Sequence, residues 1–348
     1  MAERDTPIYE RIAPVPERIW DKGAGLDALL EGAREPFVLR ELVADWPLVA
    51  AGQSAAGRDG ARAARRYLLD HARDRAFKVS IGPPGHDGRL FYDDAMEMNF
   101  RVGTGKLGDI FAGLDKAEEL RDIRTVYLAS IDIPSHFDGL DEANPVGLGA
   151  RDPLKSIWIG TRTRIAAHND FPDNLACCAV GRRRFTLFPP QQFPNLYLGP
   201  IDNTPAGRVV SMVDFDAPDL AAHPRFVDAM AEARTVELEP GDAIFIPSMW
   251  WHHVEGLEDF NVLVNYWWRR SPAWLGQPQD ALHHAILAIR DLPDADKAIW
   301  RTMFDHYVFD NGAHVTDHIP EPARGILAPL TPESAGRLRA FLLRMFSR

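Results

Sequence analysis

A histidine and a carboxylate separated by one residue, His168-Asn169-Asp170, could bind a metal ion together. Side chains two residues apart on a β-strand point to the same side, so this spacing would present an imidazole and a carboxylate side by side. Two imidazoles and one carboxylate on one face of the metal are typical of non-haem Fe(II) centres. A second histidine from a distant segment is needed to complete such a site.

That second histidine is expected within residues 241–254, where a Gly-Asp turn, a short apolar stretch and two tryptophans precede His252 and His253. Adjacent side chains on a strand point to opposite sides, so at most one of the two histidines can face the metal. The pattern alone leaves open which of them does.

Two other patterns resemble the same ligand pair. His136-Phe137-Asp138 has the same spacing, but we expect it in a turn-rich loop with no strand before it. His168, by contrast, lies between two predicted strands. His253-Val254-Glu255 also has suitable spacing but no evident distal histidine of its own. The sequence therefore favours His168 and Asp170.

The central part of the chain, residues 121–272, is expected to form the core domain. Its apolar runs are short, rich in Val, Ile, Phe and Trp, and separated by Gly, Pro and Asn, which favours an antiparallel barrel or jelly roll. A tight hairpin turn is expected at Gly181. The clearest predicted strands are residues 125–131, 155–160, 175–180, 183–188, 243–246 and 261–268.

The flanking regions favour helices. Residues 1–120 are expected to be an N-terminal elaboration of the barrel, with helices over 25–31 and 60–73 and a strand over 35–40. Residues 273–348 are expected to be a helical region suited to dimerisation, with helices over 281–290 and 296–308. A last helix should begin at Thr331 as N-cap, followed by proline, and it carries an apolar stripe of Leu338, Phe341, Leu342 and Met345.

The bulk composition limits the partners and the compartment. A net charge of −11 disfavours non-specific binding to nucleic acid or an anionic membrane, so neither partner is expected. The two cysteines, Cys177 and Cys178, are adjacent and cannot link distant segments, so they should be small buried side chains. With no signal-peptide pattern and no apolar run of membrane-spanning length, a cytoplasmic protein is expected.

Several motifs occur together in a fixed order. After Pro36-Phe37-Val38-Leu39-Arg40 and Trp46-Pro47 come Val126-Tyr127-Leu128, His168-Asn169-Asp170, Gly181-Arg182-Arg183-Arg184, Leu187-Phe188-Pro189-Pro190, Glu239-Pro240-Gly241-Asp242, Trp250-Trp251-His252-His253 and Asn265-Tyr266-Trp267. This order resembles the cupin-like, JmjC-type Fe(II)- and 2-oxoglutarate-dependent oxygenases. In motif the chain is closest to the factor-inhibiting-HIF type of asparaginyl hydroxylase.

The resemblance implies a mainly β fold with flanking helices, built on a double-stranded β-helix (cupin or jelly-roll) core. It also implies Fe(II) bound by His168, Asp170 and His252, with 2-oxoglutarate as co-substrate and O2 as oxidant. Contacts to 2-oxoglutarate carry over at Tyr127, Asn174 and Arg183, while Asn265 and Trp267 would pack beside it.

The chain departs from the family pattern at two positions. Arg183 stands where the similar hydroxylase has lysine; a guanidinium can also hold a carboxylate, by two parallel hydrogen bonds. A shifted register would turn Arg182 or Arg184 inward instead. Ile165 stands where the similar hydroxylase has a hydroxyl residue facing the co-substrate, so one hydrogen bond is lost.

The resemblance also implies an activity and an assembly. We expect a dioxygenase that hydroxylates a protein side chain or a small molecule, with Trp158, Trp251 and Trp267 forming a dry wall around the reaction. The alternatives are a metal-binding cupin without 2-oxoglutarate chemistry and a non-catalytic binding module. In the similar hydroxylase the C-terminal helices form a homodimer, so a homodimer is expected here as well.

Overall fold

The computed structural model describes residues 12–21, 23, 25–83, 87–120 and 124–347. The chain divides into two compact units, residues 1–269 and residues 270–348. Neighbouring strands in the first unit pair antiparallel, apart from the parallel pair of β1 and β10.

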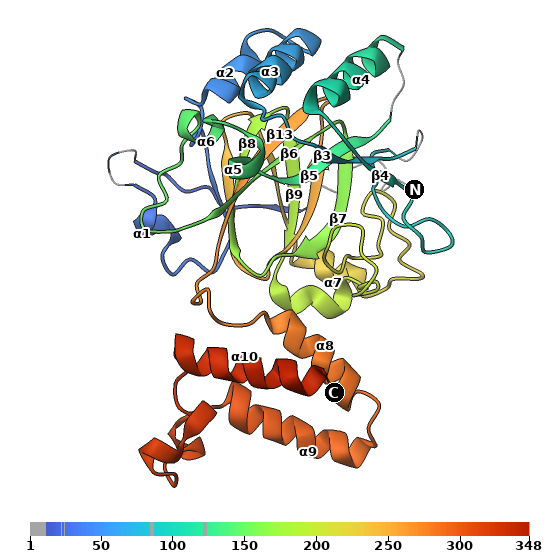
Figure 1. Ribbon diagram of the computed structural model, residues 1–348. Coiled ribbons are helices and arrows are strands. Elements are labelled where there is room, and N and C mark those ends of the chain that lie inside the picture. Colours follow the sequence, from blue (N-terminus) through green and yellow to red (C-terminus); the bar gives the residue numbers. More distant parts are fainter. Residues whose placement is uncertain (1–11, 22, 24, 84–86, 121–123, 348) are drawn as a thin grey trace. The chain divides into compact units, whose positions relative to one another are not determined.

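Within the described residues, the strands of the first unit form two sheets that face each other (Figure 1). The order in the five-stranded sheet is β1 (Ala13–Pro14), β10 (Arg234–Leu238), β9 (Arg183–Phe188), β12 (Trp251–Gly256) and β7 (Thr163–Asn169). The order in the eight-stranded sheet is β2 (Phe37–Leu39), β11 (Ala243–Ile246), β8 (Asp173–Val180), β13 (Asn261–Trp268), β6 (Leu154–Gly160), β5 (Val126–Asp132), β3 (Phe77–Ile81) and β4 (Arg101–Gly105). This arrangement confirms the predicted fold class, a jelly-roll core with flanking helices.

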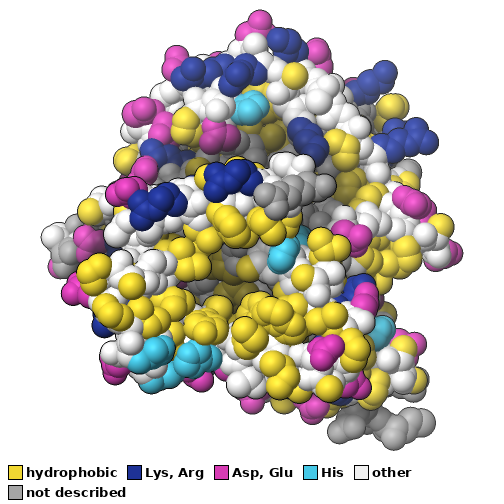
Figure 2. Space-filling model, turned by 60° about the horizontal axis from the view of Figure 1, so that its bottom comes forward, with side chains coloured by type: hydrophobic (Ala, Val, Ile, Leu, Met, Phe, Trp, Pro, Cys, Tyr) yellow, Lys and Arg dark blue, Asp and Glu magenta, His cyan; other side chains and the backbone are white. Residues whose placement is uncertain are grey.

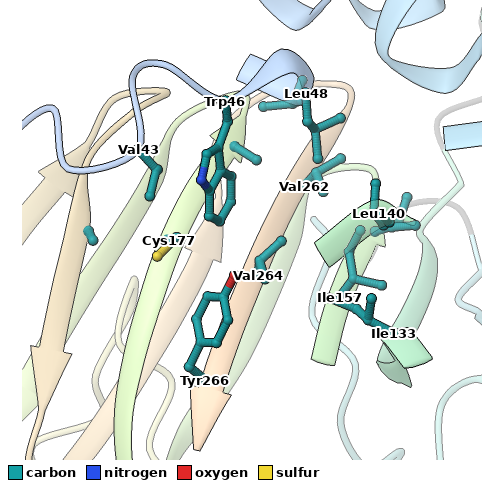
Figure 3. Close-up of a cluster of buried hydrophobic side chains, with 14 of the residues drawn as sticks. Val43, Trp46, Leu48, Ile133, Leu140, Ile157, Cys177, Val262, Val264 and Tyr266 are labelled. Carbon is teal, nitrogen blue, oxygen red and sulfur yellow. The ribbon is translucent and has the colours of Figure 1, made fainter. Parts of the chain in front are cut away.

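The largest hydrophobic core joins the eight-stranded sheet to the N-terminal helices. Figure 3 shows Trp46 and Leu48, at the start of α2, beside Val262 and Val264 of β13, with Cys177 of β8 in the same cluster. Both cysteines are buried free thiols, as predicted. The helices of this unit are α1 (Asp27–Leu30), α2 (Pro47–Gln53), α3 (Arg58–His71), α4 (Leu107–Leu120), α5 (Ile133–His136), α6 (Leu140–Ala143) and α7 (Phe226–Ala231).

Two distant motifs meet through one buried carboxylate. Asp242 accepts hydrogen bonds from the backbone N–H groups of Glu41 and Glu239, both at 3.0 Å. It also accepts one from Nη1 of Arg40 at 2.7 Å. The Pro-Gly-Asp turn before β11 is thereby tied to the arginine that follows β2, which accounts for both motifs in structural terms.

The prediction of a hairpin turn at Gly181 is wrong. β8 and β9 lie in different sheets, because both edges of β8 are already paired, with β11 and β13. Gly181 (φ +71°) makes the crossing between the sheets, and a Cβ there would lie 2.5 Å from Oδ1 of Asn261.

The second unit contains α8 (Pro278–Ile289), α9 (Asp294–Phe304) and α10 (Pro332–Phe346). As predicted, Thr331 caps the last helix: its hydroxyl accepts a hydrogen bond from the N–H of Ser334 at 3.2 Å. The helix expected over residues 296–308 ends its α-helical part at Phe304 and continues as a π-helical turn. No described helix has the length and apolar character needed to cross a membrane.

Replacing Gly181 by alanine should destabilise the protein more than replacing a glycine with equal backbone strain. Gly32 is the matched control, since its φ is +69° and an added Cβ there would meet nothing within 4 Å. We expect Gly32→Ala to cost about 1 kcal/mol through its positive φ, and Gly181→Ala to cost about 3 kcal/mol because overpacking adds to the strain. Urea unfolding measures both, and equal losses would contradict the close approach of Asn261.

Candidate metal centre

His168, Asp170 and His252 come together at one point. One ligand atom from each lies within 4.8 Å of the others, and they form the one such group of three among the residues that the structure describes. Nε2 of His252 lies 3.6 Å from Oδ2 of Asp170, and the two imidazole rings are 4.4 Å apart between centroids. Two imidazoles and a carboxylate at these separations can share one divalent metal ion.

Strand pairing brings the two histidines together. β7 and β12 are antiparallel neighbours, and His168 lies directly opposite His252. The register shifts between this pair and the next, in which Val254 lies opposite Ile165. β7 therefore holds one extra residue, a β-bulge, which lets Ile165 and His168 face the same side although they are three residues apart.

Asp170 lies just beyond the end of β7. Its backbone carbonyl accepts a hydrogen bond from the N–H of Met249 at 2.8 Å, which holds it beside β12. Met249 adopts φ +70°, in the left-handed region that non-glycine residues rarely adopt. The turn before β12 is therefore shaped to bring the carboxylate beside His252.

Backbone hydrogen bonds orient both imidazoles. Nδ1 of His168 lies 2.9 Å from the carbonyl oxygen of Ala166, and Nδ1 of His252 lies 3.0 Å from that of Trp250. A carbonyl oxygen can only accept, so Nδ1 carries the proton in each ring and the lone pair is on Nε2. Burial and the neighbouring His168 lower the pKa of His252 to about 4, so its imidazole is neutral at pH 7, the form that binds metal.

The competing histidines lie elsewhere. His253 points to the opposite side of β12, and its ring packs 4.5 Å from that of Phe215. His136 contacts Phe77, and its Nδ1 lies 3.1 Å from the carbonyl oxygen of Asp132. The prediction that no strand precedes His136 is wrong, because β5 ends at Asp132, directly before the short helix that contains this histidine.

A cavity of about 440 Å³ opens beside the three metal-ligand candidates. All eight site residues predicted from the sequence line it. They are His168, Asp170 and His252 together with Tyr127, Asn174, Arg183, Asn265 and Trp267.

Arg183 is a buried cation inside this cavity, only 1% exposed. The neighbouring arginines point outward: Nε of Arg182 donates to Glu258 at 2.8 Å, and Nη2 of Arg184 donates to Glu237 at 2.6 Å. The structure therefore has the register in which Arg183, and not Arg182 or Arg184, points into the cavity.

Two donors of the Arg183 guanidinium, Nε and Nη2, are buried without a hydrogen-bond partner in the part of the chain that the structure describes. Tyr127 lies against this guanidinium. Burial raises the pKa of the Tyr127 hydroxyl, although the charge of Arg183 and a hydrogen bond to it act in the opposite direction. A buried cation with unpaired donors is costly, so the arrangement suits a bound anion such as a carboxylate.

The remaining predicted contacts lie on neighbouring strands. Nδ2 of Asn265 donates to Oδ1 of Asn174 at 2.8 Å, which leaves Oδ1 of Asn265 without a partner among the described residues. Ile165 lines the cavity as an apolar side chain, as its position before His168 implied.

The expected tryptophan wall is only partly correct. Trp158 and Trp267 line the cavity and meet edge to face at 5.9 Å. Trp251 instead belongs to a separate hydrophobic cluster with Ala167 and Phe188. As the neighbour of His252 on β12, it points to the opposite side of the sheet.

Sequence reasoning missed one wall of the cavity, which β3 and β4 supply. The run Phe77-Lys78-Val79-Ser80-Ile81 alternates apolar and polar residues, a strand signal that would have placed Lys78 and Ser80 on one face. The structure confirms this alternation, since Phe77 and Val79 are buried and the two polar residues line the cavity. The loop residues 204–207, which also line it, carry no comparable signal.

A double-stranded β-helix with a His-x-Asp…His cluster at its mouth defines a cupin-type metal-binding fold. The chain belongs to the family of cupin-like domains, since the family profile described as "Cupin-like domain" matches residues 27–273, well over half of the chain. The resemblance drawn from the motifs is thereby confirmed at the level of the family.

Curated relatives share this region. The chain is 34% identical to the lysine-specific demethylase JMJ31 of Arabidopsis thaliana over 38% of its own length and 24% of the relative's. It is 28% identical to the tRNA wybutosine-synthesizing protein 5 of Gallus gallus over 62% of its length and 59% of the relative's. It is 33% identical to human HSPB1-associated protein 1 over 40% of its length and 28% of the relative's. The chain thus spans between about a quarter and three fifths of the length of these relatives.

Removing a ligand of the candidate metal centre should abolish tight metal binding. We expect Asp170→Ala and His252→Ala each to weaken Fe(II) binding, measured by anaerobic equilibrium dialysis, by about 100-fold or more. His136→Ala is the control, since it removes the histidine of the competing His-x-Asp pattern, and it should leave the affinity unchanged. Loss of binding in His136→Ala with retention in His252→Ala would show that the metal is bound by the His136-x-Asp138 pattern instead.

Proposed function

We propose that this protein is an Fe(II)- and 2-oxoglutarate-dependent dioxygenase that hydroxylates its substrate. The observation that carries the proposal is the pairing of two features in one cavity. The cluster of His168, Asp170 and His252 offers a two-histidine, one-carboxylate site. Arg183, which lines the same cavity, offers buried donors without a partner among the described residues.

Each residue then has a chemical task. His168, Asp170 and His252 would hold the iron from one side, leaving the cavity side open. Arg183, supported by the hydroxyl of Tyr127, would hold the distal carboxylate of 2-oxoglutarate. The chemistry supplied when Fe(II), 2-oxoglutarate and O2 are bound is oxidative decarboxylation coupled to hydroxylation of a C–H bond.

The second pair of polar contacts supports the same assignment. Asn174 and Asn265 are linked by a hydrogen bond, which fixes both amides at the cavity wall, and Oδ1 of Asn265 has no partner among the described residues. The apolar side chains of Trp158, Trp267 and Ile165 limit the access of water to this wall. A positioned and partly dry site is what the protein itself contributes to such a reaction.

The substrate proposed is a protein side chain or a small molecule. The relatives include a lysine-specific demethylase and a tRNA wybutosine-synthesizing protein, so family membership alone does not select a substrate. The net charge of −11 supports a substrate other than nucleic acid.

Removing the guanidinium of Arg183 should weaken 2-oxoglutarate binding and spare the metal site. Because hydrogen bonds to charged groups contribute roughly 1.5–3 kcal/mol, Arg183→Met should raise the concentration of 2-oxoglutarate needed for succinate formation by about 10- to 100-fold. Arg184→Met, which removes an outward-facing arginine of the same strand, should leave it unchanged.

Metal affinity and melting temperature, measured on the same samples, separate a local effect from misfolding. If wild-type protein binds Fe(II) but shows no visible charge-transfer band on anaerobic addition of 2-oxoglutarate, the chain is a metal-binding cupin without this chemistry. Protein that binds neither would be a non-catalytic module.

The C-terminal unit supports the further proposal of a homodimer. Among its described residues only Val315 and Ala335 are buried, so its helices have almost no core of their own. Large apolar side chains are exposed instead, and hydrophobic residues gather over the face shown in Figure 2. The exposed large apolar side chains of this unit include Leu282, Leu287, Ile299, Trp300, Phe341, Leu343 and Phe346.

A charged substitution in this apolar surface should disrupt a two-fold dimer, because the same patch acts on both subunits. Leu282, 53% exposed on α8, is the site for the change Leu282→Arg. We expect a dimer for the wild-type protein and a monomer for Leu282→Arg by multi-angle light scattering. His283→Arg, one residue further along the same helix, is the control, and a monomeric wild-type protein would contradict the proposal.

A further inference from the structure

One cation in the cavity remains without a counter-charge once the proposed co-substrate is bound. The charged residues among the described lining are Lys78, Asp170 and Arg183. In the proposed complex, the two positive charges of Fe(II) and the one of Arg183 balance the single charge of Asp170 and the two of 2-oxoglutarate. The positive charge of Lys78 then has no counter-charge among the described residues that line the cavity.

Lys78 also lacks an ion-pair partner within the described ranges of the chain. Three other described lysines are paired, Lys106 with Asp74, Lys155 with Asp141 and Lys297 with Asp294, whereas Lys116 on α4 is unpaired among the described residues and lines no part of the cavity. Lys78 is exposed to solvent and also lines the cavity. The lining contains no acidic side chain other than the metal-ligand candidate Asp170.

The backbone fixes where Lys78 points. Phe77 and Val79 are buried in the core on one side of β3, so Lys78 and Ser80 face the cavity on the other. Ser80 lies opposite Tyr127 of β5 and Val102 of β4 in the register. Lys78, two residues along, is therefore offset by roughly 6–7 Å from the level of Tyr127, which belongs to the proposed co-substrate site.

A β-bulge in β5, on the same wall, turns Ser130 toward the cavity. Ala129 and Ser130 are consecutive in β5, yet both line the cavity, because the pairing with β6 shifts register between Leu128 and Ile131. Ser130 adopts φ +50°, a strained conformation for a serine, and bulges of this kind re-aim side chains next to functional sites. Lys78, Ser80 and Ser130 together form a polar corner on a wall that is otherwise apolar.

Most of the remaining cavity lining is hydrophobic. It comes from the segment before β4, from β4 itself, from the loop before α7 and from the facing strands. The apolar residues are Leu90, Met98, Phe100, Val102, Pro205, Ala206, Val254 and Leu263. A ligand that fits this part needs an apolar body and one negatively charged end.

We infer that the substrate of the proposed oxygenase carries a carboxylate that binds Lys78, with an apolar portion that extends across the cavity toward the metal centre. This inference rests on the proposed function, because the charge balance assumes bound Fe(II) and 2-oxoglutarate. The carboxylate belongs either to a free organic acid or to an acidic side chain of a peptide, and the recognising chemistry is the same.

The experiment uses full-length protein loaded with Mn(II) in place of Fe(II) and with 2-oxoglutarate. Two sets of probes are titrated by calorimetry. One contains phenylalkanoic acids from phenylacetate to phenylhexanoate, each with its primary amide. The other contains short acetylated peptides with Asp or Glu, each with its Asn or Gln counterpart. We expect at least one acid to bind about tenfold more tightly than its amide, a modest preference because Lys78 is exposed to solvent.

Lys78→Met should remove this preference, and Lys78→Glu should reverse it, so that the amide of each pair binds more tightly than the acid. Lys116→Met, which changes an exposed lysine on α4 that lines no part of the cavity, should leave the preference intact. The set of probes that binds identifies the source of the carboxylate.

Binding of 2-oxoglutarate is measured first, on the same samples. Its absence in the wild-type protein would overturn the proposed function itself. Binding of 2-oxoglutarate with no preference for any acid, or with a preference that survives Lys78→Met, would overturn only the inference about the substrate. Weaker 2-oxoglutarate binding in Lys78→Met would likewise overturn it, by assigning Lys78 to the co-substrate.

Discussion

The candidate metal centre depends on the pairing of β7 with β12. His168 and His252 face each other only because β7 contains one extra residue between Ile165 and His168. Without that bulge, alternation along the strand would place Ala167 opposite His252 and turn His168 to the other side. One inserted residue therefore decides whether the barrel mouth presents a pair of imidazoles.

A second constraint on the cavity is the buried charge of Arg183. Arg183 is held almost completely out of water, with two donors unpaired among the described residues, while its neighbours Arg182 and Arg184 are satisfied by glutamates on the outer face. A fold keeps such a cation buried at a cost in stability, which an anionic ligand offsets when it binds. Lys78, the other cation that lines the cavity, is exposed to solvent, so its charge carries no such cost.

Sequence reasoning reached the fold and the site by different routes. Short apolar runs predicted most core strands, and the spacing of His168 and Asp170 with the motif at His252 predicted the cluster that the structure brings together. The crossing at Gly181 was misjudged because a turn signal does not show which sheet each strand joins. The bulge in β7 has no local signature, and β4 (RVGTG) has little apolar character to reveal it. The bulge in β7 and the strand conformation of β4 both depend on pairing with strands that are distant in the chain.

The orientation of the two histidines has a consequence for how this protein can change over time. Each ring is fixed by a carbonyl two residues earlier in its own chain segment, at Ala166 and Trp250, rather than by another side chain. Substitutions elsewhere in the cavity cannot remove these bonds, because every residue supplies a carbonyl. The wall formed by β3, β4 and the loop before α7 is thus free to diversify, and new specificities can arise while the reactive centre is inherited unaltered.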